Sequence, residues 1–153
     1  MSEDRAGEAA ALLDLDAAEC VDLLRGQEVG RLAVSDPRGP VVHPVNYAMV
    51  DDIIVVRLHT GTLLSAADGS NVSFQVDDIN RVSHSGWSVL VHCLAEKVTP
   101  LHSPQQIDAS QSSPSRPWAP GEREELLRLI PHSITGRRIR PAGTSPFQPG
   151  AYL

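Results

Sequence analysis

The segment 55–64, VVRLHTGTLL, joins a cation to a turn of small and hydroxyl-bearing residues. Arg57 stands at the end of a β-branched run, so its guanidinium can project from a rigid strand. Thr60, Gly61 and Thr62 follow, and they offer two hydroxyls and a backbone that an anion can approach closely. This pattern is compatible with a phosphate site. On these residues alone, an ordinary glycine turn with a solvated Arg57 is favoured.

A second candidate is HPVNY, residues 43–47, where a proline interrupts an extended segment. Pro44 has no N–H, so neighbouring main-chain groups are left without ladder partners. A planar heteroaromatic ligand can use such groups, and Asn46 adds an amide. The alternative is an edge strand or a bulge, which is where prolines occur within sheets.

A third candidate is HSGWSVLV, residues 84–91, in which Trp87 and Ser88 follow a glycine at the start of a long strand. One interpretation is an aromatic wall and a hydroxyl at the mouth of a cleft. The other is a core tryptophan, which is the commoner environment for a single Trp.

Hydrolytic and metal chemistry find no support in the sequence. There is no G-x-S-x-G or H-E-x-x-H motif. The six histidines are scattered singly, at positions 43, 59, 84, 92, 102 and 132. No metal site is therefore predicted, and no catalytic acid or base is identified. Cys20 and Cys93 form no paired motif, which is typical of a reducing cytosol.

The net charge of −6, from 13 basic and 19 acidic residues, argues against nucleic-acid binding. Lys97 is the one lysine, so a bound anion would be held by arginines or backbone N–H groups. No apolar run approaches the roughly 20 residues of a membrane helix. The acidic first residues do not resemble a secretory signal, so we expect a cytoplasmic protein without membrane contact.

One helix and a set of short strands are predicted. Asp16 and Glu19 form a capping box at the helix start, Leu15 and Cys20 a hydrophobic staple, and Gly26 a C′ residue. The alternation of apolar residues predicts strands over 28–35, 40–50, 53–58, 71–78, 86–98, 125–131 and 133–140. Short helices are expected over 61–69 and 103–110, and a Ser/Pro-rich connection over 110–122.

Strands at hairpin spacing with few helices favour a closed or nearly closed β-barrel. We expect a frayed lead-in over residues 1–14, one domain over 15–140, and a flexible tail over 141–153.

Taken in order, these stretches resemble the pyridoxamine 5′-phosphate oxidase-like, FMN-binding split-barrel family, in its nitroimidazole-resistance-type branch. The motifs that carry the resemblance are GRLAVSDPRGPVVHPVNYAMVDDIIVVR, GT-L, VSFQVDDI, HSGWSVLV, PW-PGER and ITGRRI. They span about residues 16–140. The resemblance implies a mainly β fold, a six-stranded antiparallel split β-barrel of Greek-key type with a few short helices. It also implies a homodimer with FMN in clefts at the subunit interface.

The resemblance assigns cofactor contacts to residues from every candidate segment. The backbone at Pro44, Val45, Asn46 and Tyr47 would border the isoalloxazine ring. Arg57, Gly61 and Thr62 would meet the phosphate, beside Leu58 and Leu63. Trp87 and Ser88 would line the same cleft, and Arg137 or Arg138 could reach cofactor or substrate.

Leu58 and Leu63 depart from the family pattern, which often has a threonine and a lysine at these positions. A hydroxyl and an ammonium would then be missing from the phosphate shell. Loss of one charge-assisted contact costs about 1.5–3 kcal/mol, or roughly one to two decades in affinity. FMN is still the expected cofactor, and loss of both contacts would leave its binding weak or absent.

The expected function is that of an FMN-dependent oxidoreductase acting on a small molecule, with a reduced nicotinamide or deazaflavin as a possible donor. The alternative is a non-catalytic split-barrel dimer that binds another small ligand, or none, in a degraded flavin site. Leu58 and Leu63 favour this alternative, whereas PVNY and GWS favour the enzyme.

Overall fold

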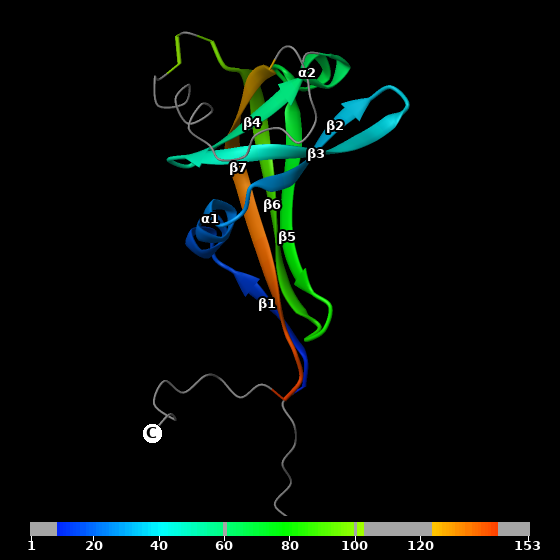
Figure 1. Ribbon diagram of the computed structural model, residues 1–153, viewed down its shortest axis with the longest axis vertical. Helices are drawn as coiled ribbons and strands as arrows, with labels where there is room; N and C mark the ends of the chain where they lie inside the picture. Colours follow the sequence, from blue (N-terminus) through cyan, green and yellow to red (C-terminus); the bar gives the residue numbers. More distant parts are fainter. Residues whose placement is uncertain (1–8, 60, 100, 103–123, 144–153) are drawn as a thin grey trace, which may run out of the picture.

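The structure, a computed structural model, describes residues 9–59, 61–99, 101–102 and 124–143 of the 153-residue chain. Figure 1 shows the arrangement of its helices and strands. The elements are β1 (Ala11–Leu15), α1 (Ala17–Arg25), β2 (Val29–Asp36), β3 (Gly39–Val50), β4 (Ile53–His59), α2 (Thr62–Ala67), β5 (Asn71–Asn80), β6 (Ser85–Lys97) and β7 (Glu124–Arg140).

The strands form one antiparallel sheet that closes on itself. Its order is β1-β7-β4-β3-β2-β5-β6, and β7 also pairs with β6. Six strands therefore form a ring, and β1 is added outside it along β7. The β2–β5 contact involves only three residue pairs, which leaves the barrel split at one side. The expected six-stranded antiparallel split barrel with short helices is confirmed.

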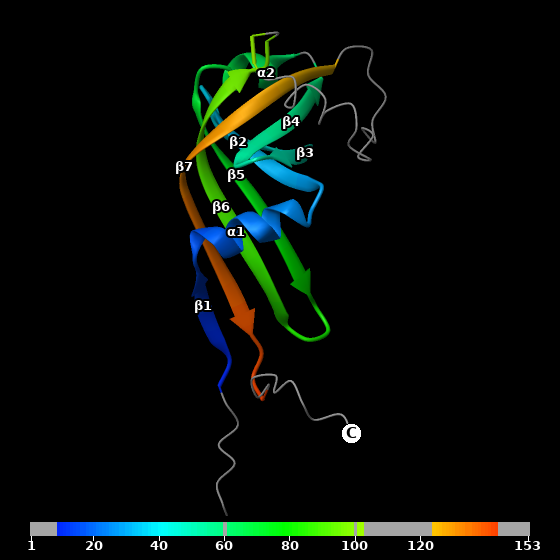
Figure 2. The ribbon, with the colours of Figure 1, turned by 90° about the vertical axis from the view of Figure 1, so that its left-hand side faces the viewer.

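Strands β5, β6 and β7 extend well beyond the ring, and α1 and β1 lie along the lower part of β7 (Figures 1 and 2). Helix α2 lies at the other end of the barrel, beyond the end of β4. The two ends of the molecule are therefore built from different elements.

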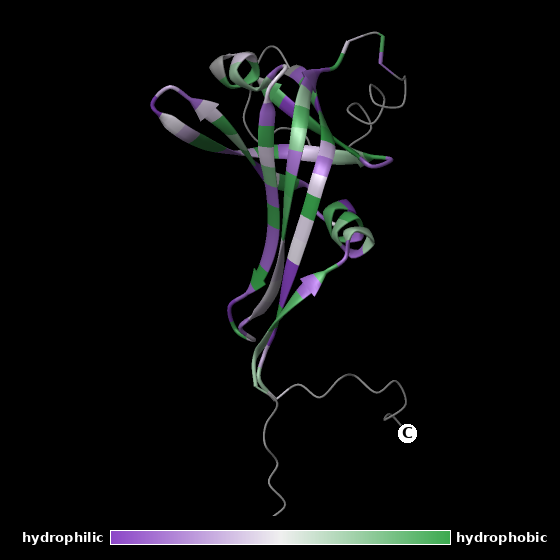
Figure 3. Ribbon diagram, turned by 180° about the vertical axis from the view of Figure 1, so that it is seen from behind, coloured by the Kyte–Doolittle hydropathy of each residue, from purple (hydrophilic) through white to green (hydrophobic). Residues whose placement is uncertain are grey.

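The core follows the two-residue period of the strands. In β6, every second residue is buried, namely Trp87, Val89, Val91, Cys93 and Ala95. The intervening residues of this strand are exposed or partly exposed. Figure 3 shows the same alternation of hydrophilic and hydrophobic residues along the strands.

Helix α1 begins as predicted. Asp16 Oδ1 accepts a hydrogen bond from Glu19 N at 2.8 Å, and Glu19 Oε2 accepts one from Asp16 N at 2.9 Å, which completes the capping box. Gly26 ends the helix, but its φ of −85° is right-handed, so it does not form the left-handed C′ cap.

The expectation of a frayed lead-in up to residue 14 is wrong for residues 11–14. They belong to β1, which pairs with β7 from Ala11 opposite Arg140 to Leu15 opposite Gly136. The middle residues of β1 are exposed, so this segment has no alternation of apolar and polar residues that would predict a strand. Pairing with the end of β7 fixes the strand instead.

The two strands expected over 125–131 and 133–140 form a single strand, β7. A bulge joins them: Cys93 faces Pro131 and His92 faces Ser133, so His132 is the extra residue. A bulge bends a strand without ending it. The proline therefore marks an irregularity within β7 and not a break.

Pro44 occupies the edge position that its missing N–H requires. It faces Arg31 of β2, whereas β4 pairs only with residues 46–50 of β3. The helix expected over 103–110 and the connection over 110–122 lie outside the described residues. Within the described ranges, no helix is long and apolar enough to cross a membrane.

Candidate functional site

The first group of candidate residues lies where β3 and β4 pair. Asn46 faces Arg57, and the same row continues to Val29 of β2 and Leu126 of β7. Directly opposed residues share a face of an antiparallel pair. The amide of Asn46 and the guanidinium of Arg57 therefore lie side by side, on the face turned away from the core.

The other residues of the PVNY segment alternate between the two faces of β3. Pro44 is exposed, whereas Val45 and Tyr47 belong to the core. The Tyr47 hydroxyl donates a hydrogen bond of 2.5 Å to the Leu24 carbonyl at the end of α1. Burial raises the pKa of this hydroxyl. Tyr47 is thus a structural link between β3 and α1, and its backbone N–H donates to the Glu28 carbonyl at 3.0 Å.

Leu58 and Leu63 both pack inward. Leu58 is 4% exposed and continues the buried positions Ile54 and Val56 of β4. Leu63 lies in α2, within the segment expected to form a short helix, and it packs against the core. A hydroxyl at position 58 would face this core. The interpretation of Leu58 as a gap in a solvent-facing phosphate shell is therefore not supported by its placement.

Gly61 comes directly before α2, and its φ of 165° is extended backbone. A Cβ built on it meets no atom within 4 Å, so the main chain is open to solvent there. The side chain of Thr62 lies outside the described part of the structure.

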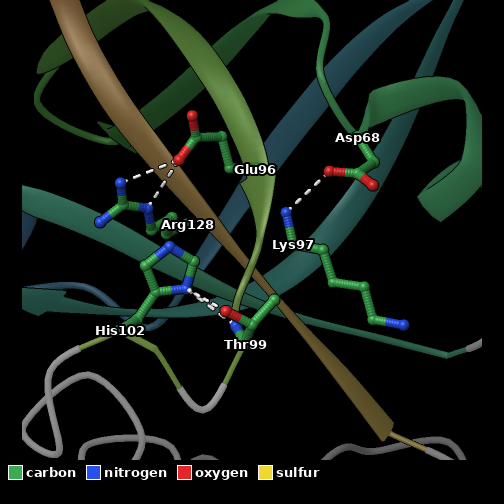
Figure 4. Close-up of polar contacts among 6 residues, drawn as sticks. All are labelled: Asp68, Glu96, Lys97, Thr99, His102 and Arg128. Carbon is green, nitrogen blue, oxygen red and sulfur yellow. Dashed lines mark hydrogen bonds and ion pairs between the residues drawn. The ribbon is translucent and has the colours of Figure 1, made fainter.

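Two cations at this end of the barrel are paired with carboxylates. Arg128 donates to Glu96 Oε2 from Nε at 3.0 Å and from Nη2 at 2.8 Å (Figure 4). Lys97 Nζ lies 3.3 Å from Glu125 Oε2, and Glu125 faces Leu58 across the β4–β7 pair. The strand pairing thus brings Lys97 close to the end of β4, which its sequence position did not indicate. Neither pair adds net positive charge.

The second group of candidate residues lies on β6 and β7. Ser88 faces Arg137, on the outward side of both strands. Trp87 faces Arg138 on the opposite side, and Trp87 is only 8% exposed. Trp87 and Ser88 therefore cannot line one cleft of a single chain with their side chains.

A cavity of about 400 Å³ opens beside Trp87 at the far end of β6 and β7. Its lining residues are Asp78, Asn80, Ser85, Gly86, Trp87, Arg138, Ile139, Arg140 and Pro141. It combines an aromatic edge with two arginines and several hydrogen-bonding groups. Arg138 lies in the ITGRRI motif and was a candidate, whereas Arg140 was not, because this motif ends at Ile139.

The two groups lie far apart within one chain. Arg57 faces Leu126 near the start of β7, whereas Ser88 faces Arg137 near its end. The eleven residue steps from Leu126 to Arg137 span at most roughly 36 Å at about 3.3 Å per residue. A single chain therefore does not bring Arg57 together with Ser88 or Arg137.

Comparison with known proteins decides the family. The family model described as pyridoxamine 5′-phosphate oxidase matches residues 16–138. The chain belongs to the pyridoxamine 5′-phosphate oxidase family. The resemblance inferred from the sequence motifs is thereby confirmed.

Solved structures of this family agree with that assignment. An FAD-binding protein from Mycobacterium smegmatis is 32% identical, with a TM-score of 0.70 over 84% of this chain and 100% of its own. An FAD-binding protein from Mesorhizobium loti is 26% identical, with a TM-score of 0.74 over 86% and 99%. A candidate 5-nitroimidazole antibiotic resistance protein from Bacteroides thetaiotaomicron shares the fold at 11% identity, with a TM-score of 0.63 over 95% and 98%.

Proposed function

We propose that this protein is a cytoplasmic, homodimeric, flavin-dependent oxidoreductase that acts on a small molecule. The observation that carries the proposal is the long distance, within one chain, between two groups of candidate residues. Arg57 and Asn46 lie near one end of β7, and Ser88 and Arg137 lie near the other. A two-fold dimer would allow the first group of one copy to meet the second group of the other.

The residues present fit a flavin. Arg57 and Asn46 supply a cation and an amide on one outward surface, and the open main chain at Gly61 follows them. These are groups that bind phosphate oxygens. When bound, a flavin supplies hydride and one-electron transfer. The chain itself would hold the phosphate end and keep the ring away from bulk water.

The cavity at Trp87 supports a site for a larger cofactor. Its volume of about 400 Å³ is in the range of roughly 300–1,000 Å³ for small-molecule sites. Arg138 and Arg140 could meet a second phosphate, which FAD has and FMN lacks. Since the relatives from Mycobacterium smegmatis and Mesorhizobium loti are FAD-binding proteins, both flavins belong in the test. A nicotinamide or deazaflavin is the expected reductant.

Complementation between two variants tests the shared site. Arg57→Ala and Arg137→Ala are each expected to lose flavin affinity, measured by fluorescence titration with FMN and with FAD. When the two are unfolded together and refolded, mixed dimers form. One of the two sites in each mixed dimer lacks both changes, so about one quarter of all sites should regain parental affinity.

Two controls accompany this experiment. Light scattering should give twice the 16.5 kDa chain mass. Arg38→Ala, in an exposed hairpin turn, should leave flavin affinity unchanged, since its cation pairs only with the neighbouring Asp36 among the contacts described. A monomer, or a mixture that regains no sites, would contradict the shared site.

The alternative function is a split-barrel dimer that does not use flavin. The placement of Leu63 favours it, because an apolar side chain stands where relatives often have an ammonium. Absence of flavin absorption after purification and after incubation with FMN or FAD would support this alternative over the oxidoreductase.

A further inference from the structure

We propose that His92 and His132 form a copper(II) site on the outer surface of the barrel. His92 lies on the outward side of β6, between the buried Val91 and Cys93. His132 lies next to it on β7. The site is distinct from both groups of flavin candidates and does not depend on the proposed function.

The bulge in β7 creates this pair. His132 is the extra residue between Pro131 and Ser133, which face Cys93 and His92. Bulges re-aim side chains and are common beside functional sites. Here the two imidazole rings lie nearly parallel, with 18° between their planes and 6.4 Å between their centroids.

The centroid separation is the upper limit for two imidazoles that share one metal ion, and the stacked rings must rotate so that one nitrogen of each faces the ion. Metal–imidazole bonds of about 2.0–2.1 Å place a ring centroid roughly 3.2 Å from the ion. Two imidazoles on opposite sides of one ion therefore have centroids at most about 6.4 Å apart. Both histidines are exposed, so small rotations can bring them closer without disturbing the core.

Ser73 orients the imidazole of His92 for metal binding. Its Oγ lies 3.0 Å from His92 Nδ1, across the β5–β6 pair. A metal-binding histidine almost always donates its second ring N–H to a neighbouring acceptor. When Nδ1–H donates to Ser73, the lone pair is on Nε2, and this nitrogen is available to the ion. Ser73 is thus a positioning residue.

The surroundings favour copper over a hard cation. A cavity of about 270 Å³ beside the pair is lined by Ala33, Val34, Ser35, Pro40, Asn71, Val72, Ser73, His92 and His132. None of these carries a carboxylate, which magnesium and calcium require, or a permanent positive charge that would repel an ion.

The number of side-chain ligands available also favours copper, here over zinc. Within the described residues, no group of three or more His, Cys, Asp or Glu side chains is placed to hold a metal. A tetrahedral zinc site is therefore not formed. Copper(II) accepts two imidazoles with water or amide oxygen in a tetragonal arrangement, and it binds most tightly in the divalent series.

The test is copper titration of the tag-free chain, followed by electron paramagnetic resonance and calorimetry. The parent should bind one Cu²⁺ with superhyperfine splitting from two nitrogens. His92→Gln and His132→Gln should each bind at least about tenfold more weakly, and their spectra should show no more than one nitrogen. Zinc should bind more weakly than copper.

His84→Asn is the matched control, because His84 is also exposed and asparagine tolerates its positive φ of 51°. It should leave affinity and spectrum unchanged. Ser73→Ala should weaken binding about tenfold while two nitrogens remain in the spectrum, and Ser73→Thr should restore the affinity.

NMR spectra of the parent chain provide a test that does not depend on whether the variants fold. Substoichiometric Cu²⁺ should broaden the ring-proton signals of two of its six histidines in NMR spectra. Equal broadening of all six, or equal loss of affinity in His84→Asn and His92→Gln, would show adventitious binding and overturn the proposal.

Discussion

Gly136 of β7 lies directly against Cys20 of α1. A Cβ built on Gly136 would be 2.5 Å from Cys20 Sγ, and 3.2 Å from Leu15 Cδ1. Cys20 is fully buried, and Leu15 packs against the core. Both members of the predicted hydrophobic staple thus contact the same glycine, which sets how closely α1 approaches the sheet.

Gly136→Ala is therefore expected to destabilise the fold by about 1–3 kcal/mol, because the helix start must move away from β7. Chemical denaturation at neutral pH measures the change. Gly26→Ala is the control, since its added Cβ makes an ordinary 3.5 Å contact. Cys20→Ala should offset part of the loss in the double variant. Additive losses would contradict this contact as the cause.

The pH dependence of stability follows from Cys93. Burial raises the pKa of this thiol from its ordinary value of 9.0 to about 12. Between these two values the unfolded chain releases a proton that the native chain keeps. Folding stability is therefore unaffected by Cys93 below about pH 9 and falls as the pH rises toward 12. Burial raises the pKa of Tyr47 as well, which adds a loss of the same sign.

Cys93→Ala should flatten this alkaline decline, although the lost side chain lowers stability at every pH. The measurement is the denaturation free energy between pH 7 and pH 11 under reducing conditions. Parallel curves for parent and variant would show that Cys93 does not titrate as described.

Local rules predicted much of the fold. The Asp16–Glu19 capping box acts within one turn, and the alternation of apolar residues located the long strand over 86–98. β1 could not be predicted in this way, because it depends on pairing with a strand more than a hundred residues later. Pro131 suggested a break where the structure has a bulge.

For the candidate site, prediction from the sequence was limited in a different way. The inward position of Leu58 was available from the alternation with Ile54 and Val56, but the family pattern directed attention to its missing hydroxyl. The separation of Arg57 from Arg137 depends on the register of β7, which sequence patterns do not contain.

Arg57→Ala is expected to weaken flavin binding at least tenfold, since it removes the charge assigned to the phosphate. Arg57→Lys should retain part of the affinity, because the charge remains while the planar fork is lost. Riboflavin, which has no phosphate, should bind all three proteins equally. Fluorescence titration gives the three affinities. Equal FMN affinity in parent and Arg57→Ala would remove Arg57 from the site.

The two leucines that depart from the family pattern are expected to behave differently from each other. Leu58→Thr places a hydroxyl in the core and removes apolar volume, so it should cost about 2–5 kcal/mol of stability. Leu63 is only partly buried in α2, so Leu63→Lys should be tolerated, with its ammonium reaching solvent.

Leu63→Lys alone should therefore test the phosphate shell. If position 63 borders the phosphate, FMN affinity should rise by roughly one to two decades through a charge-assisted bond, whereas riboflavin affinity should stay the same. Leu63→Met, which keeps the length without the charge, is the matched control. An equal gain for FMN and riboflavin would show that the lysine acts elsewhere. No gain, together with tight binding by the parent, would show that Arg57 and main-chain groups already complete the shell.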